Sequence, residues 1–301
     1  MIEKVKVGEN LELSRVVHGL MRLSSWEMTS QEILELIEGC IELGVTSFDH
    51  ADIYGAYTCE ELFGKALALK PSLRERIQLV TKCGIKLISS NRPEHKVKHY
   101  DTSKKHIIES VERSLKNLET DYIDLLLIHR PDPFMNPDEV SDAFNQLKKE
   151  GKVLNYGVSN FKPSQFDMLS SRLDTPLVTN QIEVSPLNFE NFDNGSIEKC
   201  KQKGIPPMVW SPLAGGSIFN SNEDKVSRVR RTFEEIREEV GAPSIDYIIY
   251  AWILNHPANM IPIVGSGKLE RIKVAVEAVK IKLTRQQWFR VWESSMGREV
   301  D

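Results

Sequence analysis

The sequence FDHADIYG, residues 48–55, places carboxylates, an imidazole and a phenol directly after an apolar run. A phenol has a pKa of about 10, so it exchanges protons poorly near neutral pH. A neighbouring ammonium group favours the phenolate and lowers that pKa. The ammonium in turn needs a carboxylate partner, because an unpaired buried charge is costly. Asp49 and Tyr54 could therefore belong to a proton-donating group that is completed by a lysine.

Two later segments supply side chains of the required types. Lys82 stands in VTKCG and His129 in LLLIHRPD, each at the end of an apolar run. A neutral imidazole next to the phenol could orient a substrate oxygen. Taken singly, Asp49 could be a turn or N-cap residue and His129 a core histidine. The four residues together, in this order, favour the chemical interpretation.

The elements that must position these residues alternate along the chain. Apolar runs rich in β-branched residues are separated by amphipathic segments with helical spacing, which predicts eight strand–helix pairs. The expected strands are Val16–Leu20, Thr46–Phe48, Ile77–Thr81, Ile123–Ile128, Leu154–Val158, Thr179–Val184, Met208–Trp210 and Met260–Val264. Repeated right-handed crossovers close into a barrel, and the G-x-G-x-x-G motif of a doubly wound sheet is absent after the first strand. We therefore predict an α/β fold, a (β/α)8 TIM barrel, as a single domain over residues 1–301.

Two segments stand outside the eightfold count. Residues 4–14 (KVKVGENLELS) predict a β-hairpin that caps the N-terminal end of the barrel, and residues 284–295 predict an extra C-terminal helix. Thr29 with Glu32 forms a capping-box signature for the first barrel helix. Thr102 is the expected N-cap of the third.

Composition excludes several classes of function. The chain has 301 residues and a net charge of −4, which is not the basic footprint of a nucleic-acid-binding protein. Its start, MIEKVKVGEN, lacks the apolar region of a signal peptide, and no run is long enough to span a membrane. The four cysteines form no C-x-x-C pair, so we expect neither disulfides nor a metal site. We expect a cytoplasmic monomer with a small-molecule substrate.

Six motifs in order carry a family resemblance: FDHADIYG, VTKCG, LLLIHRPD, YGVSNF, NQIEVSPL and WSPLAGG. Together they resemble the aldo-keto reductase superfamily, and FDHADIYGAY and TRQQWFR resemble its bacterial YdhF-type oxidoreductases. The resemblance implies that Tyr54 is the general acid in carbonyl reduction and that Lys82 lowers its pKa. It also implies that Asp49 pairs with Lys82 and that His129 orients the carbonyl.

The resemblance further implies a nicotinamide cofactor and the residues that bind it. Ser159, Asn160 and Gln181 would hold the carboxamide, and Trp210 would stack on the ring. Ser211, Pro212, Leu213 and Gly215 would line the pyrophosphate, and Gly265, Ser266, Lys268 and Arg271 would meet the adenosine 2′-phosphate. Cations at a helix N-terminus favour NADPH over NADH. Val274 and Ala275 stand where many members have a Glu-Asn pair that contacts adenine, so the resemblance does not extend there.

Two other functions are compatible with parts of the pattern. A metal-dependent barrel hydrolase could use Asp49, His50, Asp52 and His129, but it would need a His-rich first strand, and Lys82 would repel the cation. A cofactor-binding regulatory protein of the same fold with little turnover stays open, because an intact tetrad does not exclude it. The sequence favours an NADPH-dependent oxidoreductase that reduces an aldehyde or ketone to an alcohol.

Overall fold

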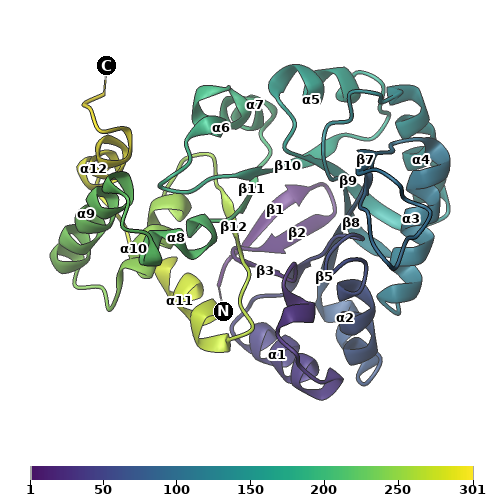
Figure 1. Ribbon diagram of the computed structural model, residues 1–301, viewed down its shortest axis with the longest axis horizontal. Coiled ribbons are helices and arrows are strands. Elements are labelled where there is room, and N and C mark those ends of the chain that lie inside the picture. The colour runs from purple at the N-terminus through teal and green to yellow at the C-terminus, as the bar shows by residue number, and fades with distance from the viewer. Residues whose placement is uncertain (1, 301) are drawn as a thin grey trace.

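Eight parallel strands form a closed barrel at the centre of the molecule (Figure 1). The computed structural model describes residues 2–300. Around the barrel the strands follow the order β10-β11-β12-β3-β4-β5-β8-β9. They are β3 (Val17–Gly19), β4 (Ser47–Asp49), β5 (Gln78–Cys83), β8 (Ile123–Ile128), β9 (Val153–Ser159), β10 (Leu177–Glu183), β11 (Met208–Trp210) and β12 (Ile261–Val264). The predicted barrel is confirmed, and each of these strands overlaps one of the eight expected runs.

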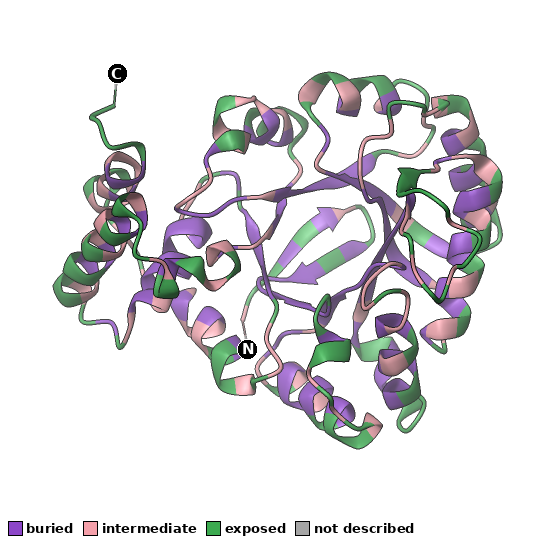
Figure 2. Ribbon diagram, in the orientation of Figure 1, coloured by how far each residue is buried: buried purple, intermediate pink, exposed green. Residues whose placement is uncertain are grey.

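One helix after each strand forms the outer layer. These helices are α1 (Ser30–Glu42), α2 (Cys59–Leu67), α3 (Lys104–Asn117), α4 (Pro137–Lys149), α5 (Pro163–Ser170), α7 (Ser196–Lys203), α10 (Ile245–Leu254) and α11 (Leu269–Ala278). The strands are buried on both faces (Figure 2), by apolar side chains inside the barrel and by the helices outside. This double burial explains why the strands read as continuous apolar runs.

The hairpin β1 (Lys4–Gly8) and β2 (Leu11–Ser14) closes the N-terminal end of the barrel, as predicted. Its apolar residues Val5, Val7, Leu11 and Leu13 pack into the barrel core. The backbone N–H of Ser14 donates to Ser47 Oγ, at the start of β4, over 2.9 Å. The cleft side of the barrel is therefore its other end, where the strands finish.

Further elements decorate the barrel. Short strands β6 (Ile85–Lys86) and β7 (His99–Tyr100) pair as an arm, residues 85–100, inserted after β5. The remaining helices are α6 (Glu190–Asp193), α8 (Ser217–Asn220), α9 (Asp224–Val240), α12 (Arg285–Met296), η1 (Leu23–Ser25), η2 (Pro71–Arg76) and η3 (Ala214–Gly216). The extra C-terminal helix α12 is confirmed. Helix α9, which lies beside α12 in Figure 1, is an additional helix that the eightfold count does not contain.

Helix capping agrees with the sequence at one site and corrects it at another. Thr29 forms the expected capping box with Glu32 at the start of α1. At α3, however, Ser103 and not Thr102 is the N-cap, and its Oγ accepts from the His106 backbone N–H. The Thr102 hydroxyl instead donates to Asp132 Oδ2 over 2.8 Å. Between residues 2 and 300, no helix combines the length and apolar character of a membrane span.

Candidate active site

Asp49, Tyr54, Lys82 and His129 converge at the C-terminal end of β4, β5 and β8, where barrel enzymes carry their sites. Lys82 Nζ lies 2.8 Å from both carboxylate oxygens of Asp49 and 3.0 Å from Tyr54 Oη. It also donates to the His50 backbone carbonyl over 2.7 Å. The ring centroids of Tyr54 and His129 are 5.9 Å apart, edge to face. The tetrad expected from the sequence is thus one cluster.

The electrostatics of the cluster follow from its burial. Burial raises the pKa of the Tyr54 phenol, and Asp49 adds to the rise, although Lys82 opposes it. Burial alone would lower the pKa of Lys82, but Asp49 and Tyr54 together raise it above its usual value. Burial and the Lys82 charge hold the pKa of His129 well below its usual range. At neutral pH the group therefore combines a protonated phenol, an ammonium and a neutral imidazole.

The loop that carries Tyr54 needs an unusual backbone. Gly55 has a φ of +58°, and a Cβ at this position would lie 2.6 Å from both Cys59 Sγ and Ser24 Oγ. Ala56 and Tyr57 also have positive φ values, of 53° and 75°. Glycine is the residue that enters this region without strain. The loop therefore holds the Tyr54 side chain toward Lys82 at a conformational cost.

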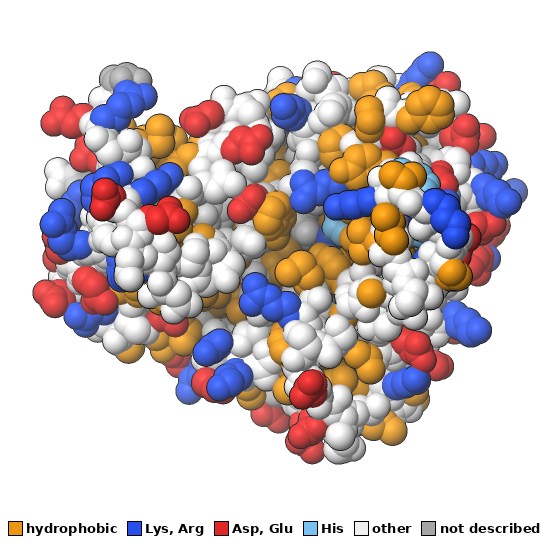
Figure 3. Space-filling view, viewed as in Figure 1, with side chains coloured by type: hydrophobic (Ala, Val, Ile, Leu, Met, Phe, Trp, Pro, Cys, Tyr) orange, Lys and Arg blue, Asp and Glu red, His pale blue; other side chains and the backbone are white. Residues whose placement is uncertain are grey.

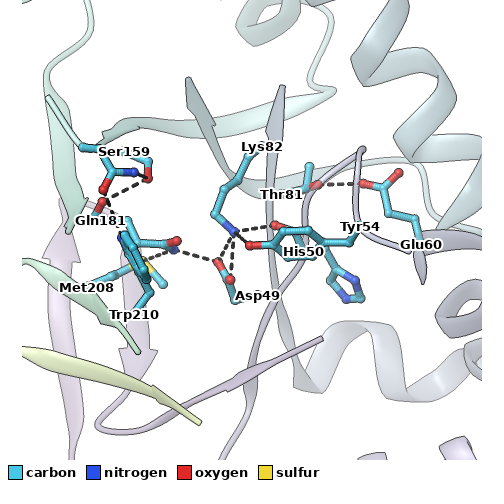
Figure 4. A network of polar contacts seen from close by, with 11 residues as sticks. Asp49, His50, Tyr54, Glu60, Thr81, Lys82, Ser159, Gln181, Met208 and Trp210 are labelled. Atoms are coloured by element: carbon cyan, nitrogen blue, oxygen red, sulfur yellow. Dashed lines mark hydrogen bonds and ion pairs between the residues drawn. The ribbon is translucent and has the colours of Figure 1, made fainter. Parts of the chain in front are cut away.

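A second hydrogen-bonded chain crosses the barrel to the tetrad (Figure 4). Trp210 Nε1 donates to Asn160 Oδ1 over 3.0 Å, and Asn160 Nδ2 donates to Ser159 Oγ over 2.7 Å. Ser159 Oγ donates to the Gln181 carbonyl over 3.0 Å. Gln181 Nε2 then donates to Asp49 Oδ1 over 2.8 Å. The four residues expected to meet a nicotinamide are therefore physically connected to the tetrad.

These residues line one cleft of about 1050 Å³. Its lining includes Asp49, Tyr54, His129, Ser159, Asn160, Gln181, Trp210, Ser211, Pro212, Leu213, Gly215, Gly265, Ser266 and Arg271. Lys82 lies beneath it, fully buried, and Lys268 is not among the lining residues. The volume exceeds that of an ordinary drug-sized pocket, which leaves room for a dinucleotide and a small substrate together.

Several residues along this cleft have positive φ values. Asn160 and Ser211 have φ values of 61° and 54°, and Ala214 has one of 50°. Gly215 and Gly216 follow with φ of +66° and +96°, and nothing lies within 4 Å of a Cβ built at either. Such strain collects where a ligand is held. The loop after β11 therefore exposes its backbone to the cleft.

His50 and Asp52 do not form a ligand site. His50 is buried edge-on against Phe63, at 4.5 Å between centroids, and neither of its ring nitrogens has a partner. Asp52 Oδ2 accepts from Ser110 over 2.7 Å, and burial raises its pKa to about 7. Within residues 2–300, no group of three or more His, Cys, Asp or Glu side chains is placed to hold a metal ion. His50 and Asp52 are buried, and they support the loop that carries Tyr54.

The structure brings in residues that sequence reasoning missed. Glu60, on α2, is buried and accepts from Thr81 Oγ1 over 2.6 Å, next to Lys82 in the chain. Trp26, which precedes α1, stacks on His18 with 5.9 Å between ring centroids. The C-terminal helix α12 lines a separate cavity of about 660 Å³ against α6, with Trp288 and Trp292 in its wall. Ala275 is fully buried and so cannot contact adenine.

The closed barrel, the tetrad and the cleft above it point together to one family of enzymes. The aldo/keto reductase family model matches residues 15–295, and the chain belongs to this family. It is therefore an oxidoreductase enzyme of a family that acts on carbonyl groups with nicotinamide cofactors.

Several relatives are similar along their whole length. The chain is 56% identical to the oxidoreductase YcsN of Bacillus subtilis, covering 99% of this chain and 100% of YcsN. It is 47% identical to the oxidoreductase YdhF of Escherichia coli, covering all of both chains. It is 41% identical to a 6-dehydroglucose reductase of Agrobacterium fabrum, over 99% of this chain and 100% of the relative.

A solved structure shares the fold. It is a thermostable aldo-keto reductase, Tm1743, in complex with the inhibitor epalrestat, with a TM-score of 0.82 and 28% identity. The match covers 97% of this chain and 100% of the solved one.

Proposed function

We propose that this enzyme reduces an aldehyde or ketone to an alcohol with NADPH, and that Tyr54 is the general acid. The observation that carries the proposal is the position of Tyr54 Oη, 3.0 Å from an ammonium that a carboxylate holds in place. Tyr54 and His129 both line the cleft, whereas Lys82 is buried beneath it. The proton-donating group therefore faces the space that a substrate would enter.

The residues present fit a nicotinamide dinucleotide. Ser159, Asn160 and Gln181 offer amide and hydroxyl groups beside Trp210, as a carboxamide requires. The open backbone around Gly215 suits a pyrophosphate, because no Cβ hinders its approach. Arg271 lies in the first turn of α11 and lines the cleft, as Ser266 does, and it fits a 2′-phosphate at a helix N-terminus. When bound, NADPH supplies the hydride.

Residues of the protein itself donate the proton and stabilise the developing charge. Tyr54 Oη donates its proton to the carbonyl oxygen as that oxygen becomes an alkoxide. Lys82 stabilises the phenolate left behind, and Asp49 keeps the ammonium in position. The neutral imidazole of His129 orients the substrate oxygen. Donors already in place cost no reorganisation at the moment of reaction.

Enzyme assays with a carbonyl panel test this proposal. NADPH consumption is followed at 340 nm with aldehydes, ketones and 6-dehydroglucose, the last because two relatives, 41% and 33% identical, are named 6-dehydroglucose reductases. Tyr54→Phe should lower kcat by roughly 100- to 10,000-fold with little change in NADPH binding. Tyr247→Phe, whose hydroxyl bonds to Glu277 on the outer wall, is the matched control. Turnover that survives Tyr54→Phe would refute the role of Tyr54.

The same assay addresses the regulatory alternative. A protein that binds NADPH tightly but turns over no member of the panel would favour the regulatory alternative.

We also propose that the chain is one domain and acts as a cytoplasmic monomer. The family match over residues 15–295 supports the single domain, and four free cysteines within the described residues fit a reducing compartment. Light scattering of the purified protein tests the monomer.

A further inference from the structure

The active-site cleft has two ends that the barrel order separates. Strands β11 and β12 are neighbours and carry the loops assigned to the cofactor. Strands β5 and β8 are neighbours on the other side, and they carry Lys82, His129 and the arm. With the cofactor at the β11–β12 side, as proposed above, the space left for a substrate lies between the tetrad and the arm, at the β5–β8 end.

Four cations line the cleft, and two of them, Lys98 and Arg130, come from the β5–β8 side, whereas Arg22 follows β3 and Arg271 lies on α11. Lys98 lies on the arm just before β7, and Arg130 follows His129 at the end of β8. The Arg130 guanidinium carbon is 5.7 Å from the centroid of the Trp210 ring. In the space-filling view, Lys and Arg side chains stand around the central hollow (Figure 3). Two positively charged side chains, Lys98 and Arg130, are therefore available to a substrate in this part of the cleft.

Neither of these cations forms an ion pair with an acidic side chain within the described residues. Of all the ion pairs in the described part of the chain, none includes Lys98 or Arg130. Asp49 and Asp246 are the acidic residues lining the cleft. Asp49 is held by Lys82, and Asp246 lies on α10, at the cofactor end. Glu183 lies close enough to Arg130 for their charges to interact, but they form no ion pair.

The arm that carries Lys98 is fixed to the Tyr54 loop. The Leu87 backbone N–H donates to Tyr57 Oη over 2.8 Å, and Asn91 Nδ2 donates to the Ala56 carbonyl over 2.9 Å. At the base of the arm, Lys86 forms an ion pair with Asp101 over 2.8 Å. Lys98 thus belongs to a segment held against the loop that aims the proton donor.

We propose that the substrate is an anionic carbonyl compound, whose carboxylate or phosphate is bound by Lys98 and Arg130 while its carbonyl oxygen meets Tyr54 and His129. This inference rests on the proposed function. A charged hydrogen bond to an anion is worth roughly 10- to 100-fold in binding. The planar guanidinium can hold a carboxylate or phosphate with two bonds, and the lysine adds a point charge. Lys98 and Arg130 are therefore specificity-determining residues.

Matched substrate pairs test the proposal. One pair is 4-oxobutanoate and its neutral methyl ester, and the other is glyceraldehyde 3-phosphate and glyceraldehyde. The ratio of kcat/KM for the anion to kcat/KM for the neutral partner is measured for the wild type, Lys98→Met, Arg130→Met and the control Lys105→Met. Lys105 lies on the outer helix α3 with its side chain 84% exposed. The better pair identifies the anion as carboxylate or phosphate.

We expect a wild-type ratio of roughly 10 or more for at least one pair. Each cleft variant should lower kcat/KM for the anion several-fold more than kcat/KM for its neutral partner, so that the ratio falls, and Lys105→Met should leave the ratio unchanged. Ratios near one in the wild type, or ratios that neither variant alters, would overturn the proposal.

A binding measurement separates this inference from the proposed function. Succinate and 3-phosphoglycerate, which carry no reducible carbonyl, are titrated calorimetrically into the protein with NADP+ present. Binding that is lost in Lys98→Met or Arg130→Met supports the anion site, even if no carbonyl is turned over and the proposed function fails. Absence of binding together with reduction of neutral carbonyls would reject the anion site and leave the reductase function standing.

Discussion

Replacing Lys82 by methionine should destabilise the protein and remove its activity together. Lys82 donates to both Asp49 oxygens, to a backbone carbonyl and to Tyr54, all from a fully buried position. Lys82→Met keeps a side chain of similar length but leaves the Asp49 carboxylate buried with Gln181 as its remaining donor. Breaking one half of a buried ion pair costs about 3–5 kcal/mol.

The size of this penalty can be measured by thermal unfolding. At an unfolding entropy of about 2.1 cal/mol/K per residue, a loss of this size lowers the unfolding midpoint of this 301-residue chain by roughly 5–8 °C. Because the pKa of Lys82 is raised, its contribution is complete below about pH 10.4, the value in an unfolded chain. The contribution is lost only as pH rises through the higher folded value. The Lys82 contribution to the difference in unfolding free energy between wild type and variant should therefore be the same at pH 6 and pH 9.

A double variant separates charge from packing. Asp49→Asn combined with Lys82→Met removes both charges, so it should recover about 2 kcal/mol or more of the single variant's loss. Both variants should lose at least about 100-fold in kcat/KM, because the phenol has lost its cationic partner. Lys105 forms an exposed ion pair with Glu109 at 3.9 Å, so Lys105→Met should change the free energy of unfolding by less than about 0.5 kcal/mol. A Lys82→Met protein that unfolds at the wild-type temperature would refute this account.

Three further predictions follow from the cleft. Gly55→Ala should reduce the free energy of unfolding by more than about 2 kcal/mol and slow turnover at least tenfold, because its Cβ would meet two side-chain atoms at 2.6 Å. The control is Gly151→Ala, at φ +71° in open space, which should cost only about 1 kcal/mol in denaturant unfolding. Arg271→Met should raise KM for NADPH by roughly tenfold or more and leave KM for NADH nearly unchanged; equal effects on both cofactors would place the 2′-phosphate elsewhere. Because burial and Lys82 lower the pKa of His129, its imidazole should stay neutral, and kcat/KM should be flat between pH 6 and 8; a step near pH 6.5 that His129→Gln abolishes would contradict this.

Much of this architecture was predictable from local pattern. The eight strands read as apolar runs because both of their faces are buried, and that burial leaves the same signature in every strand. Parallel strands in a closed barrel present their C-terminal ends together, so Asp49, Lys82 and His129 could be assigned to one site without a structure. Capping residues such as Thr29 act within a single turn and are equally readable.

Tertiary structure decided what depends on distance across the fold. The bond from Gln181 to Asp49 joins β10 and β4, which lie opposite one another, and no local pattern encodes that contact. The placement of Lys98 over the cleft likewise depends on how the arm folds back. Burial also decided the pKa of Tyr54, because desolvation depends on every neighbour and outweighs the Lys82 charge. The sequence by itself determined which groups stand at the strand ends, and the closed barrel determined their partners and their charges.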